Sequence, residues 1–369
     1  MKYLKKIRKY FKVRKLRKMG YSKLYVSSSW IHSLKDAYRS SDLPKKERKW
    51  AYDRGFFPWR IQQYGLTEEN YRNIISDEDY YYLFPINNKY CSWIDDKLTI
   101  RYVLARFCRF LPAYFYHLMK GRDVMRLMDC PEEYPADLDG LIALLREKKL
   151  LAGKKCIGAF GVGFYKLEAE GDGFIVNGEK KTESEFRTFL KTLDDYIITE
   201  FVEMHPMLKK INPCSVNTIR ATVINPHGND PIFPFAFFRI GTKQSGIVDN
   251  VSSGGMVCKV DVETGRFYDG QTLRNHIYEN VEFHPDTHER LDGILPNWEL
   301  VRHTLLEIMR YCPQLKWLGF DVAITEDGFK IIEINSHQQL HKAHEYPPEV
   351  TNFLFDELRK KKKKYGIRA

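Results

Sequence analysis

Residues 318–335, with the sequence LGFDVAITEDGFKIIEIN, are the stretch that decides the fold. Two runs rich in β-branched residues flank residues 326–328, Glu-Asp-Gly, a pattern typical of a β-hairpin with a three-residue loop and glycine in the left-handed conformation. This register places Asp321 opposite Glu333. Because side chains alternate along a strand, Glu333 and Asn335 lie on the same face, and Asp321 joins them from the partner strand.

The predicted hairpin is polar on one face and apolar on the other, where Val322, Ile324, Ile332 and Ile334 are expected to pack. Two carboxylates and one amide oxygen on a single face suit a hard divalent cation that is shared with substrate phosphates. The pattern therefore indicates a magnesium–nucleotide site. An ordinary edge hairpin with solvated acids has the same local pattern and is the alternative.

The chain has 369 residues, of which 43% are hydrophobic, so it can bury a large core and form two or three domains. Its net charge of +11 is concentrated at the two ends, because ten of the first 18 residues and all of residues 359–364 are basic. In residues 1–20, apolar side chains interleave with the cations at roughly helical spacing. This favours a helix on an anionic membrane surface or on another protein, and a solvated basic helix is the alternative.

The sequence predicts a cytoplasmic protein, associated with the inner face of the membrane through residues 1–20. No segment reaches the roughly 20 apolar residues that span a bilayer, and the first residues lack the features of a signal peptide. The seven cysteines stand singly, without CxxC or CxxH spacing. This predicts reduced thiols and argues against a zinc site. No nucleic-acid partner is expected.

The residue pattern divides the chain into four parts. Residues 1–90 are basic and mainly helical, 91–205 contain a small α+β lobe, 206–350 supply longer strands and the hairpin, and 351–369 are a basic C-terminal tail. In the second part, Asp95 and Asp96 are expected to open an amphipathic helix that includes Tyr102 and ends at Pro112. A further helix is expected over 184–192, with serine as its N-cap.

A glycine-rich loop follows two lysines near residue 155. Lys154 and Lys155 precede Gly158, Gly161 and Gly163, and a strand is expected to follow at 164–167. Such a loop lets backbone N–H groups approach phosphate closely while a lysine supplies charge. The segment lacks the GK[ST] ending of a P-loop, and a plain β-hairpin turn is the alternative.

Residues 196–203, YIITEFVE, are typical of a buried strand that ends in alternating acids and apolar residues. Such a segment can present backbone groups to an adenine ring. Glu200 is the candidate partner for the exocyclic amine, and Glu203 or His205 for the ribose hydroxyls. A core strand with a solvated end is the alternative.

Two arginines lie on predicted strands. Arg220 shares a face with Thr218 and Thr222 in an alternating strand, and Arg239 lies in a similar segment. A guanidinium that faces a cleft is well shaped to hold a carboxylate or phosphate through two parallel hydrogen bonds. A polar loop with paired glycines, residues 249–255, comes after the second arginine.

Six motifs in this order resemble the ATP-grasp superfamily: the glycine loop after lysine, Ile-Thr-Glu-Phe-Val, Asn-Thr-Ile-Arg, Phe-Arg-Ile-Gly, Asp-Asn-x-Ser-Ser-Gly-Gly and Gly-Phe-Asp with Glu-Ile-Asn. Within it, the chain is most similar to the sugar-transfer-associated proteins of capsule and cell-surface polysaccharide loci. The resemblance covers residues 90 to 345. It implies an α+β, ATP-grasp fold, in which two α+β lobes clamp the nucleotide, with an extra basic and mainly helical N-terminal region.

The resemblance also implies roles for individual residues. The metal ligands are Asp321, Glu333 and Asn335, and the cofactors are ATP and one or two Mg²⁺ ions. The nucleotide contacts are Lys155, Gly158, Gly161, Gly163, Glu200, Phe201, Val202, Glu203 and His205, with Arg101 where many members carry a second phosphate-binding lysine. The catalytic residues are Arg220, Lys155 and Arg239. The substrate contacts are Asn250, Ser253, Gly254 and Gly255. Apart from the resemblance, His337 and His341 in the loop 335–347 are candidate substrate contacts, and solvated loop histidines are the alternative. Cys156 stands where members often have proline.

The implied activity is ATP- and Mg²⁺-dependent carboxylate–amine ligation through an acyl phosphate. Its partners are an amino acid or amine and a carboxylate-bearing glycan or glycan precursor. An ATP-grasp-type kinase acting on a sugar hydroxyl and a non-catalytic nucleotide-binding or nucleic-acid-binding protein are the alternatives.

Overall fold

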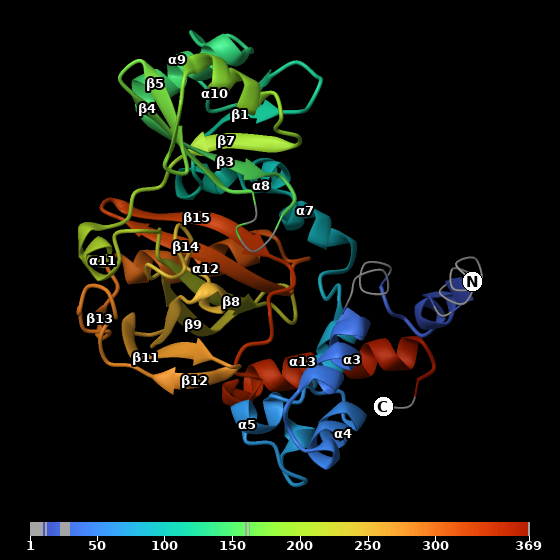
Figure 1. The fold of residues 1–369 in the computed structure, drawn as a ribbon. Helices are drawn as coiled ribbons and strands as arrows, with labels where there is room; N and C mark the ends of the chain where they lie inside the picture. The colour runs from blue at the N-terminus through green and yellow to red at the C-terminus, as the bar shows by residue number, and fades with distance from the viewer. Residues whose placement is uncertain (1–9, 12, 23–29, 159–160, 162, 368–369) are drawn as a thin grey trace.

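The computed structural model describes residues 10–11, 13–22, 30–158, 161 and 163–367. Figure 1 shows a smaller lobe built on one antiparallel sheet, a larger lobe built on a second, and a helical region on the far side of the larger lobe. No helix within these residues is both long and apolar enough to cross a membrane. The chain is a mixed α+β protein, as the sequence predicts.

The smaller sheet has the strand order β2-β1-β7-β3-β4-β5-β6. Its strands are β1 (Tyr114–Leu118), β2 (Met125–Arg126), β3 (Leu150–Lys155), β4 (Tyr165–Glu170), β5 (Gly173–Val176), β6 (Glu179–Lys181) and β7 (Tyr196–Glu200). Helices α9 (Leu138–Lys148) and α10 (Glu183–Leu190) pack on this sheet, and the stacked rings of Phe174 and Phe186 join α10 to β5. The small lobe therefore has its own apolar core.

Helix α10 begins one residue earlier than the sequence predicts, and its N-cap is Thr182 rather than serine. The Thr182 hydroxyl accepts a hydrogen bond from the Glu185 N–H at 3.3 Å, and the Glu185 carboxylate accepts one from the Thr182 N–H at 2.8 Å. This reciprocal capping box satisfies two backbone donors, which a serine at position 184 would not do.

The larger sheet has the strand order β12-β11-β10-β9-β8-β14-β15, and β13 pairs with β11. Its strands are β8 (Thr218–Ile224), β9 (Ile232–Ile240), β10 (Met256–Val260), β11 (Arg266–Arg274), β12 (Ile277–Asn280), β13 (Gly293–Ile294), β14 (Trp317–Thr325) and β15 (Gly328–Asn335). Helix α12 (Trp298–Tyr311) packs its buried side chains, among them Val301, Leu305 and Ile308, on this sheet. Helix α11 (Pro206–Ile211) follows the connection between the lobes.

Strands β14 and β15 form the predicted hairpin, and Asp321 pairs with Glu333 as expected. The turn differs from the prediction, because Thr325 pairs with Gly328 and leaves two loop residues instead of three. Gly328 has φ of 149°, a conformation that favours glycine but is not the left-handed helical one. The register that matters for the site is therefore correct, although the turn type is not.

A bulge after Asp321 changes the side-chain pattern of β15. Val322 pairs with Ile331, so Ile332 has no partner in the ladder. The prediction that Ile332 packs in the apolar core is wrong, because its side chain lines the cavity described below. The other apolar predictions are confirmed, since Val322, Ile324 and Ile334 are buried.

The helical region brings both ends of the chain together. Its helices are α3 (Trp30–Ser40), α4 (Lys45–Asp53), α5 (Arg60–Tyr64), α6 (Asp77–Leu83) and α13 (Pro348–Lys364), with 3₁₀ turns at Tyr71–Asn73, Asn88–Cys91 and Ala343–Glu345. The predicted basic tail is thus a helix, and its Val350 and Leu354 are buried against the N-terminal helices. Of the predicted membrane-binding segment, residues 13–18 are helical, whereas residues 1–9 and 12 lie outside the described residues.

The connection to the small lobe consists of α7 (Ser92–Asp95), α8 (Lys97–Val103) and a 3₁₀ segment (Ala105–Phe110). Asp96 caps α8 by accepting a hydrogen bond from the Thr99 N–H at 2.7 Å. The helix ends at Val103, well before Pro112, and Tyr102 is exposed instead of lying on an apolar face. Lys97 is the first residue of this short helix, and its side chain lines the cavity described below.

Candidate active site

A cavity of about 500 Å³ lies between the two lobes. This volume is typical of small-molecule sites, which occupy roughly 300–1,000 Å³. Strands β3 and β4 supply the wall on the small-lobe side, and β8, β9, β14 and β15 supply the opposite wall. The last residue of β7 and the four residues after it, 200–204, line one end. The cavity thus combines residues that are far apart in the sequence.

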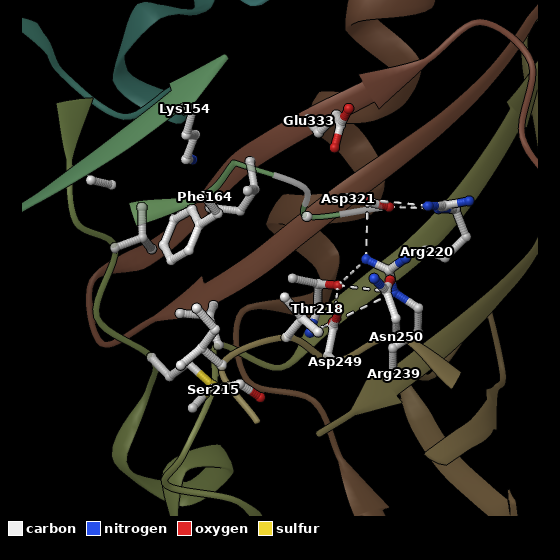
Figure 2. A pocket seen from close by; sticks show the side chains of 18 of the residues that line it. Lys154, Phe164, Ser215, Thr218, Arg220, Arg239, Asp249, Asn250, Asp321 and Glu333 are labelled. Atoms are coloured by element: carbon white, nitrogen blue, oxygen red, sulfur yellow. Dashed lines mark hydrogen bonds and ion pairs between the residues drawn. The ribbon is translucent and has the colours of Figure 1, made fainter. Parts of the chain in front are cut away.

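Asp321 is held between two arginines on the floor of the cavity (Figure 2). The Arg220 Nε and Nη2 lie 2.5 and 3.1 Å from its Oδ1 and Oδ2, and the Arg239 Nη2 lies 3.0 Å from Oδ2. Burial alone would raise the pKa of Asp321, but the two guanidinium groups hold it below its usual range. Asp321 is therefore an ionised carboxylate.

Glu333 and Asn335 line the cavity beside Asp321. The Glu333 Oε1 accepts a hydrogen bond from the Lys97 Nζ at 3.0 Å. The Asn335 amide nitrogen donates a long hydrogen bond of 3.4 Å to the Gly319 carbonyl oxygen. Two carboxylates and an amide, all in the cavity wall and adjacent in the hairpin, are a donor set that fits Mg²⁺. The structure thus brings together the three predicted metal ligands.

Lys97 is a cationic residue of the cavity for which the sequence predicted no role. Its Nζ bridges the Glu333 carboxylate and the Gly158 carbonyl oxygen, at 3.0 and 3.2 Å, so it joins the β14–β15 hairpin to the glycine loop. Arg101, which the sequence placed in this position, does not line the cavity. Its guanidinium forms a bidentate pair with Asp129, at 2.9 and 2.5 Å. Lys97 follows directly after the N-cap of α8. This position at the start of the helix is the sequence signal by which Lys97 could have been identified.

Two adjacent lysines end β3 and point to opposite faces of the strand. Lys154 shares a face with Ala152 in the cavity wall, where it is half-buried. Burial, with the charge of Lys97, lowers the pKa of Lys154 to about 8. Lys155, the predicted phosphate ligand, also reaches the cavity but is exposed, and its aliphatic chain lies beside Gly163. The alternation of side chains along a strand is the sequence signal that could have distinguished Lys154, on the cavity face, from Lys155.

The connection between the lobes supplies the opposite end of the cavity. Glu200, Phe201, Val202 and Glu203 all line it, as predicted, but His205 does not. The His205 ring instead caps α11, where its Nδ1 accepts a hydrogen bond from the Met207 N–H at 3.2 Å. The carboxylate of Glu200 accepts a hydrogen bond from the Ala113 N–H at 3.0 Å, so part of its hydrogen-bonding capacity is already used.

This end of the cavity has apolar walls on both sides. Leu150 and Ala152 come from the small lobe, Val202 and Met204 from the connection, and Ile332 from the bulge of β15. Phe164 also faces the space in Figure 2. Apolar surfaces on both sides of a narrow space suit a flat aromatic ring. The bulge, which the sequence did not reveal, is what brings Ile332 here.

The other end of the cavity is polar, and hydrogen bonds and an ion pair connect its side chains to one another. The Arg239 Nε donates to the Thr218 hydroxyl at 3.1 Å, and the Thr218 N–H donates to the Asp249 carboxylate at 2.9 Å. Arg239 also lies 3.5 Å from Asp249. Asn250 follows in the cavity wall. The loop that carries Asp249 and Asn250 is therefore fixed to β8 and β9.

Three predicted substrate contacts lie behind this wall. Ser253, Gly254 and Gly255 do not line the cavity, although Val251 and Ser252 do. Gly254 has φ of 102°, and a Cβ on Gly255 would lie 2.8 Å from the Asp249 carbonyl oxygen. The two glycines thus shape the loop and allow its close approach to the backbone.

Two histidines of the segment after β15 line the cavity. His337 stacks on Tyr80 of the helical region at 4.4 Å between ring centroids, and burial lowers its pKa to about 3. Burial also lowers the pKa of His341 to about 3, with Arg220 adding to the effect. Both rings are neutral at physiological pH, and His337 connects the cavity to the N-terminal helices.

Two of the described glycines of the glycine loop face the cavity. Gly158 and Gly161 line it, whereas Gly163 packs against Lys155 and the Tyr196 hydroxyl. Gly161 has φ of 70°, and a Cβ there would lie 2.8 Å from the Val248 side chain of the other lobe. The loop therefore comes close to the segment around Val248 at a position where only glycine fits.

The family described as sugar-transfer associated ATP-grasp matches residues 78–344. The ATP-grasp ligase PsnB in complex with its minimal precursor is similar, with a TM-score of 0.40 and 11% identity over 73% of this chain and 63% of PsnB. The chain thus spans less than two thirds of PsnB. No curated protein matches it.

Two further solved structures have similar values. The D-alanine–D-alanine ligase from Bacillus anthracis has a TM-score of 0.37 and 11% identity, over 73% of this chain and 68% of the ligase. The D-alanyl-alanine synthetase A from Vibrio cholerae O1 has a TM-score of 0.43 and 11% identity, over 74% of this chain and 66% of the synthetase.

Proposed function

The chain belongs to the sugar-transfer associated ATP-grasp family, whose match covers residues 78–344, and on this premise we propose that it is an ATP- and Mg²⁺-dependent carboxylate–amine ligase. The proposed substrates are an amino acid or amine and a carboxylate-bearing cell-surface polysaccharide or its precursor. The family's description, sugar-transfer associated, supports the glycan. The site geometry supports the phosphate chemistry.

One observation carries the proposal. The Asp321–Arg220–Arg239 cluster and the Glu333–Lys97 pair lie in one cavity between the two lobes. Carboxylates that are held by cations can exchange those partners for a divalent ion and a triphosphate without leaving unpaired buried charge. Asp321, Glu333 and Asn335 would hold Mg²⁺, which neutralises phosphate charge when it is bound.

The nucleotide fits along the length of the cavity. We assign the apolar end, between Ala152 and Ile332, to the adenine ring and the backbone of residues 200–203 to its polar edge. Lys154 and Lys97 then lie at the phosphates, with the glycine loop above them. Fixed cations around a transferring phosphoryl group stabilise charge where it develops, because they need no reorganisation during the step.

The proposed reaction has two steps. A substrate carboxylate oxygen attacks the γ-phosphorus of ATP, and the bond between that phosphorus and the ADP oxygen breaks. The amine nitrogen then attacks the acyl carbon, phosphate leaves with the C–O electron pair, and the nitrogen loses a proton. Arg220 and Arg239 lie on the substrate side of the hairpin, where guanidinium groups can position the carboxylate.

Isotope transfer tests this reaction. We would incubate the protein with ATP, Mg²⁺, a mixture of amino acids and a uronate-containing oligosaccharide whose carboxylate carries heavy oxygen. An acyl-phosphate ligase releases ADP and transfers one heavy oxygen atom to free phosphate. Phosphate retained on the sugar would instead indicate the kinase alternative, and unlabelled phosphate would indicate ATP hydrolysis without acyl transfer.

Two variants test whether label transfer depends on the proposed metal site. Glu333→Gln removes a proposed metal ligand and should abolish label transfer. Glu326→Gln changes an exposed carboxylate in the turn of the same hairpin and should leave it unchanged. Equal label transfer by both variants would overturn the assignment.

We further propose that residues 1–20 attach the protein to anionic membrane. In the part of this segment that the structure describes, Tyr10 and Phe11 are 62% and 60% exposed. Arg14, Lys15, Arg17 and Lys18 follow on the helical residues 13–18. Exposed aromatic side chains beside cations are suited to an anionic lipid surface.

A further inference from the structure

Three potential metal ligands meet outside the cavity, at the ends of three neighbouring strands. His117 is in β1, Cys156 follows β3 directly, and Asp195 directly precedes β7. Because β7 lies between β1 and β3, His117 pairs with Ile197 on one side while Lys155 pairs with Tyr196 on the other. The start of β7 therefore brings the three side chains together, although 39 residues separate each from the next (117 to 156, 156 to 195).

The three donor atoms are close enough to share an ion. The His117 nitrogen, the Cys156 sulfur and an Asp195 oxygen all lie within 4.8 Å of one another, and His117 Nε2 is 3.0 Å from Asp195 Oδ1. A tetrahedral ion with bonds of about 2.0–2.3 Å separates its ligand atoms by roughly 3.3–3.8 Å. The cluster therefore needs only small side-chain movements to surround one ion.

Burial distinguishes this cluster from a group of surface side chains. His117 is 8% exposed and Cys156 is 1% exposed, whereas the Asp195 side chain is 48% exposed. An ion therefore has a route through the Asp195 side, where water can supply a fourth ligand. Asp195 has φ of 58°, a left-handed conformation that Asp tolerates and that starts β7.

The arrangement does not suit a nucleophilic cysteine. Burial raises the pKa of Cys156, and the hydrogen bond from its thiol to Asp195 raises it further. A reactive cysteine needs a lowered thiol pKa, whereas the Asp195 carboxylate beside the Cys156 thiol acts in the opposite direction. A disulfide does not arise either, since every cysteine that the structure describes is free.

We propose that His117, Cys156 and Asp195 form a binding site for a zinc-class divalent ion. Imidazole, thiolate and carboxylate are the ligand types that Zn²⁺ takes, and three protein ligands with one water complete a tetrahedral site. On binding, the thiol proton leaves to solvent and the Cys156 sulfur bonds the ion. The absence of CxxC spacing does not exclude the site, because its ligands meet through the sheet and not through the local sequence.

Such an ion would fix the base of the glycine loop. The Cys156 N–H donates to the Asp195 carbonyl oxygen at 2.9 Å, and the Cys156 carbonyl oxygen accepts from the Lys97 N–H at 2.9 Å. Cys156 thus connects the start of β7 to the lysine that reaches Glu333, and Gly158 follows two residues later. The proposed ion would hold these three segments together behind the phosphate-binding side of the cavity.

Cobalt spectroscopy on the full-length protein tests the proposal. Co²⁺ bound to a thiolate has an intense charge-transfer absorption, whereas Co²⁺ bound by oxygen ligands, such as Asp321 and Glu333, does not. We would titrate the protein with Co²⁺ in excess Mg²⁺ and then displace it with Zn²⁺. We expect one thiolate-bound Co²⁺ per chain, loss of the absorption on adding Zn²⁺, and a higher melting temperature with Zn²⁺.

Matched variants assign the ligands. Cys156→Ser should abolish the absorption, while Cys258→Ser, at another buried cysteine, and Cys214→Ser, at an exposed one, should retain it. Asp195→Asn keeps the thiol in place and should weaken Co²⁺ binding at least tenfold, so the result does not depend on the Cys156 variant alone. Absence of the absorption from the folded wild-type protein, or its persistence in Cys156→Ser, would overturn the proposal.

Discussion

Arg220 forms a bidentate contact with Asp321, because its Nε and Nη2 lie 2.5 and 3.1 Å from Oδ1 and Oδ2. The two residues pair with each other on the neighbouring strands β8 and β14. A guanidinium can hold a carboxylate in this way because its donors form a planar fork. The contact sets the orientation of a proposed metal ligand from a neighbouring strand. It also keeps the charge of a buried carboxylate paired.

Arg220→Lys should separate orientation from charge. Lysine retains the positive charge but cannot donate to both oxygens at once, so we expect ATP turnover to fall about 100-fold. The lost charge-assisted hydrogen bond should lower the free energy of unfolding by about 1–3 kcal/mol. Steady-state kinetics and urea unfolding measure the two effects.

Arg266→Lys is the matched control for that experiment. Arg266 makes the same bidentate contact with Asp292, at 3.0 and 2.7 Å, but this pair is on the surface and remote from the cavity. Exposed ion pairs contribute about 0–1 kcal/mol, so turnover should be unchanged. Equal losses in the two variants would refute a specific role for Arg220.

The β14–β15 hairpin was predictable because the sequence pattern that specifies it is local. Alternation and a turn signal fix which side chains share a face, and the Asp321–Glu333 register follows from them. Ile332 was not predictable, since the bulge that turns it into the cavity depends on how β14 and β15 pack against their neighbours. Strand patterns therefore predicted the positions of the three proposed metal ligands but not the apolar wall of the cavity.

The cations around the proposed phosphate site could be assigned only from the three-dimensional structure. Lys97 and Arg101 lie one helical turn apart on α8, and both are plausible phosphate ligands from sequence. Asp129 pairs with Arg101, and Glu333 pairs with Lys97, so only the tertiary contacts distinguish them. His205 is similar, because its use as a helix cap follows from the position of α11.

Asn87→Ala should destabilise the fold strongly. Buried Asn87 donates to the Trp317 carbonyl oxygen at 2.8 Å and accepts from the Lys316 and Trp317 N–H groups at 2.7 and 3.1 Å. Alanine leaves these buried backbone groups unpaired, so we expect a loss of about 2–4 kcal/mol in urea unfolding. Asn73→Ala, at an exposed position, should cost less than about 0.5 kcal/mol. A small loss for Asn87→Ala would mean that the helical region contributes little to the start of β14.

The proposed membrane contact predicts salt-sensitive binding to anionic vesicles. We expect the full-length protein to co-sediment with phosphatidylserine vesicles, to be released at high salt, and to lose binding when residues 1–20 are deleted. Substituting Lys360, Lys362, Lys363 and Lys364 of α13 with Gln is the control, because it removes another group of cations. The idea fails if the deletion leaves binding unchanged, or if neutral vesicles bind equally well.

Gly161→Ala should impair closure of the glycine loop. Alanine at φ of 70° costs about 1–2 kcal/mol, and its Cβ would lie 2.8 Å from Val248. We expect ADP affinity to fall about tenfold in calorimetric titrations. Combining it with Val248→Ala should recover the part of the loss that is due to the clash, while the backbone strain remains. No recovery in the double variant would show that the two lobes do not meet at this point when nucleotide is bound.

ADP affinity should weaken as the pH rises above about 8, because Lys154 loses its proton there. Burial lowers the pKa of Lys154 from 10.5 to about 8, and only the ammonium form attracts phosphate. The phosphate groups of ADP are already fully ionised at this pH, since their last pKa is about 6. The dissociation constant should therefore rise by about tenfold in total between pH 8 and 10 and then level off, as measured by calorimetry.

Two substitutions decide which lysine is responsible. Lys154→Met should weaken ADP binding about tenfold at pH 7 and should remove the inflection near pH 8. Lys155→Met is the matched variant, because the two residues are adjacent on β3 but point to opposite faces, and it should retain both the affinity and the inflection. If Lys155→Met instead removes them, the phosphates lie on the exposed side of the loop, as the sequence alone predicted, and the assignment of Lys154 is wrong.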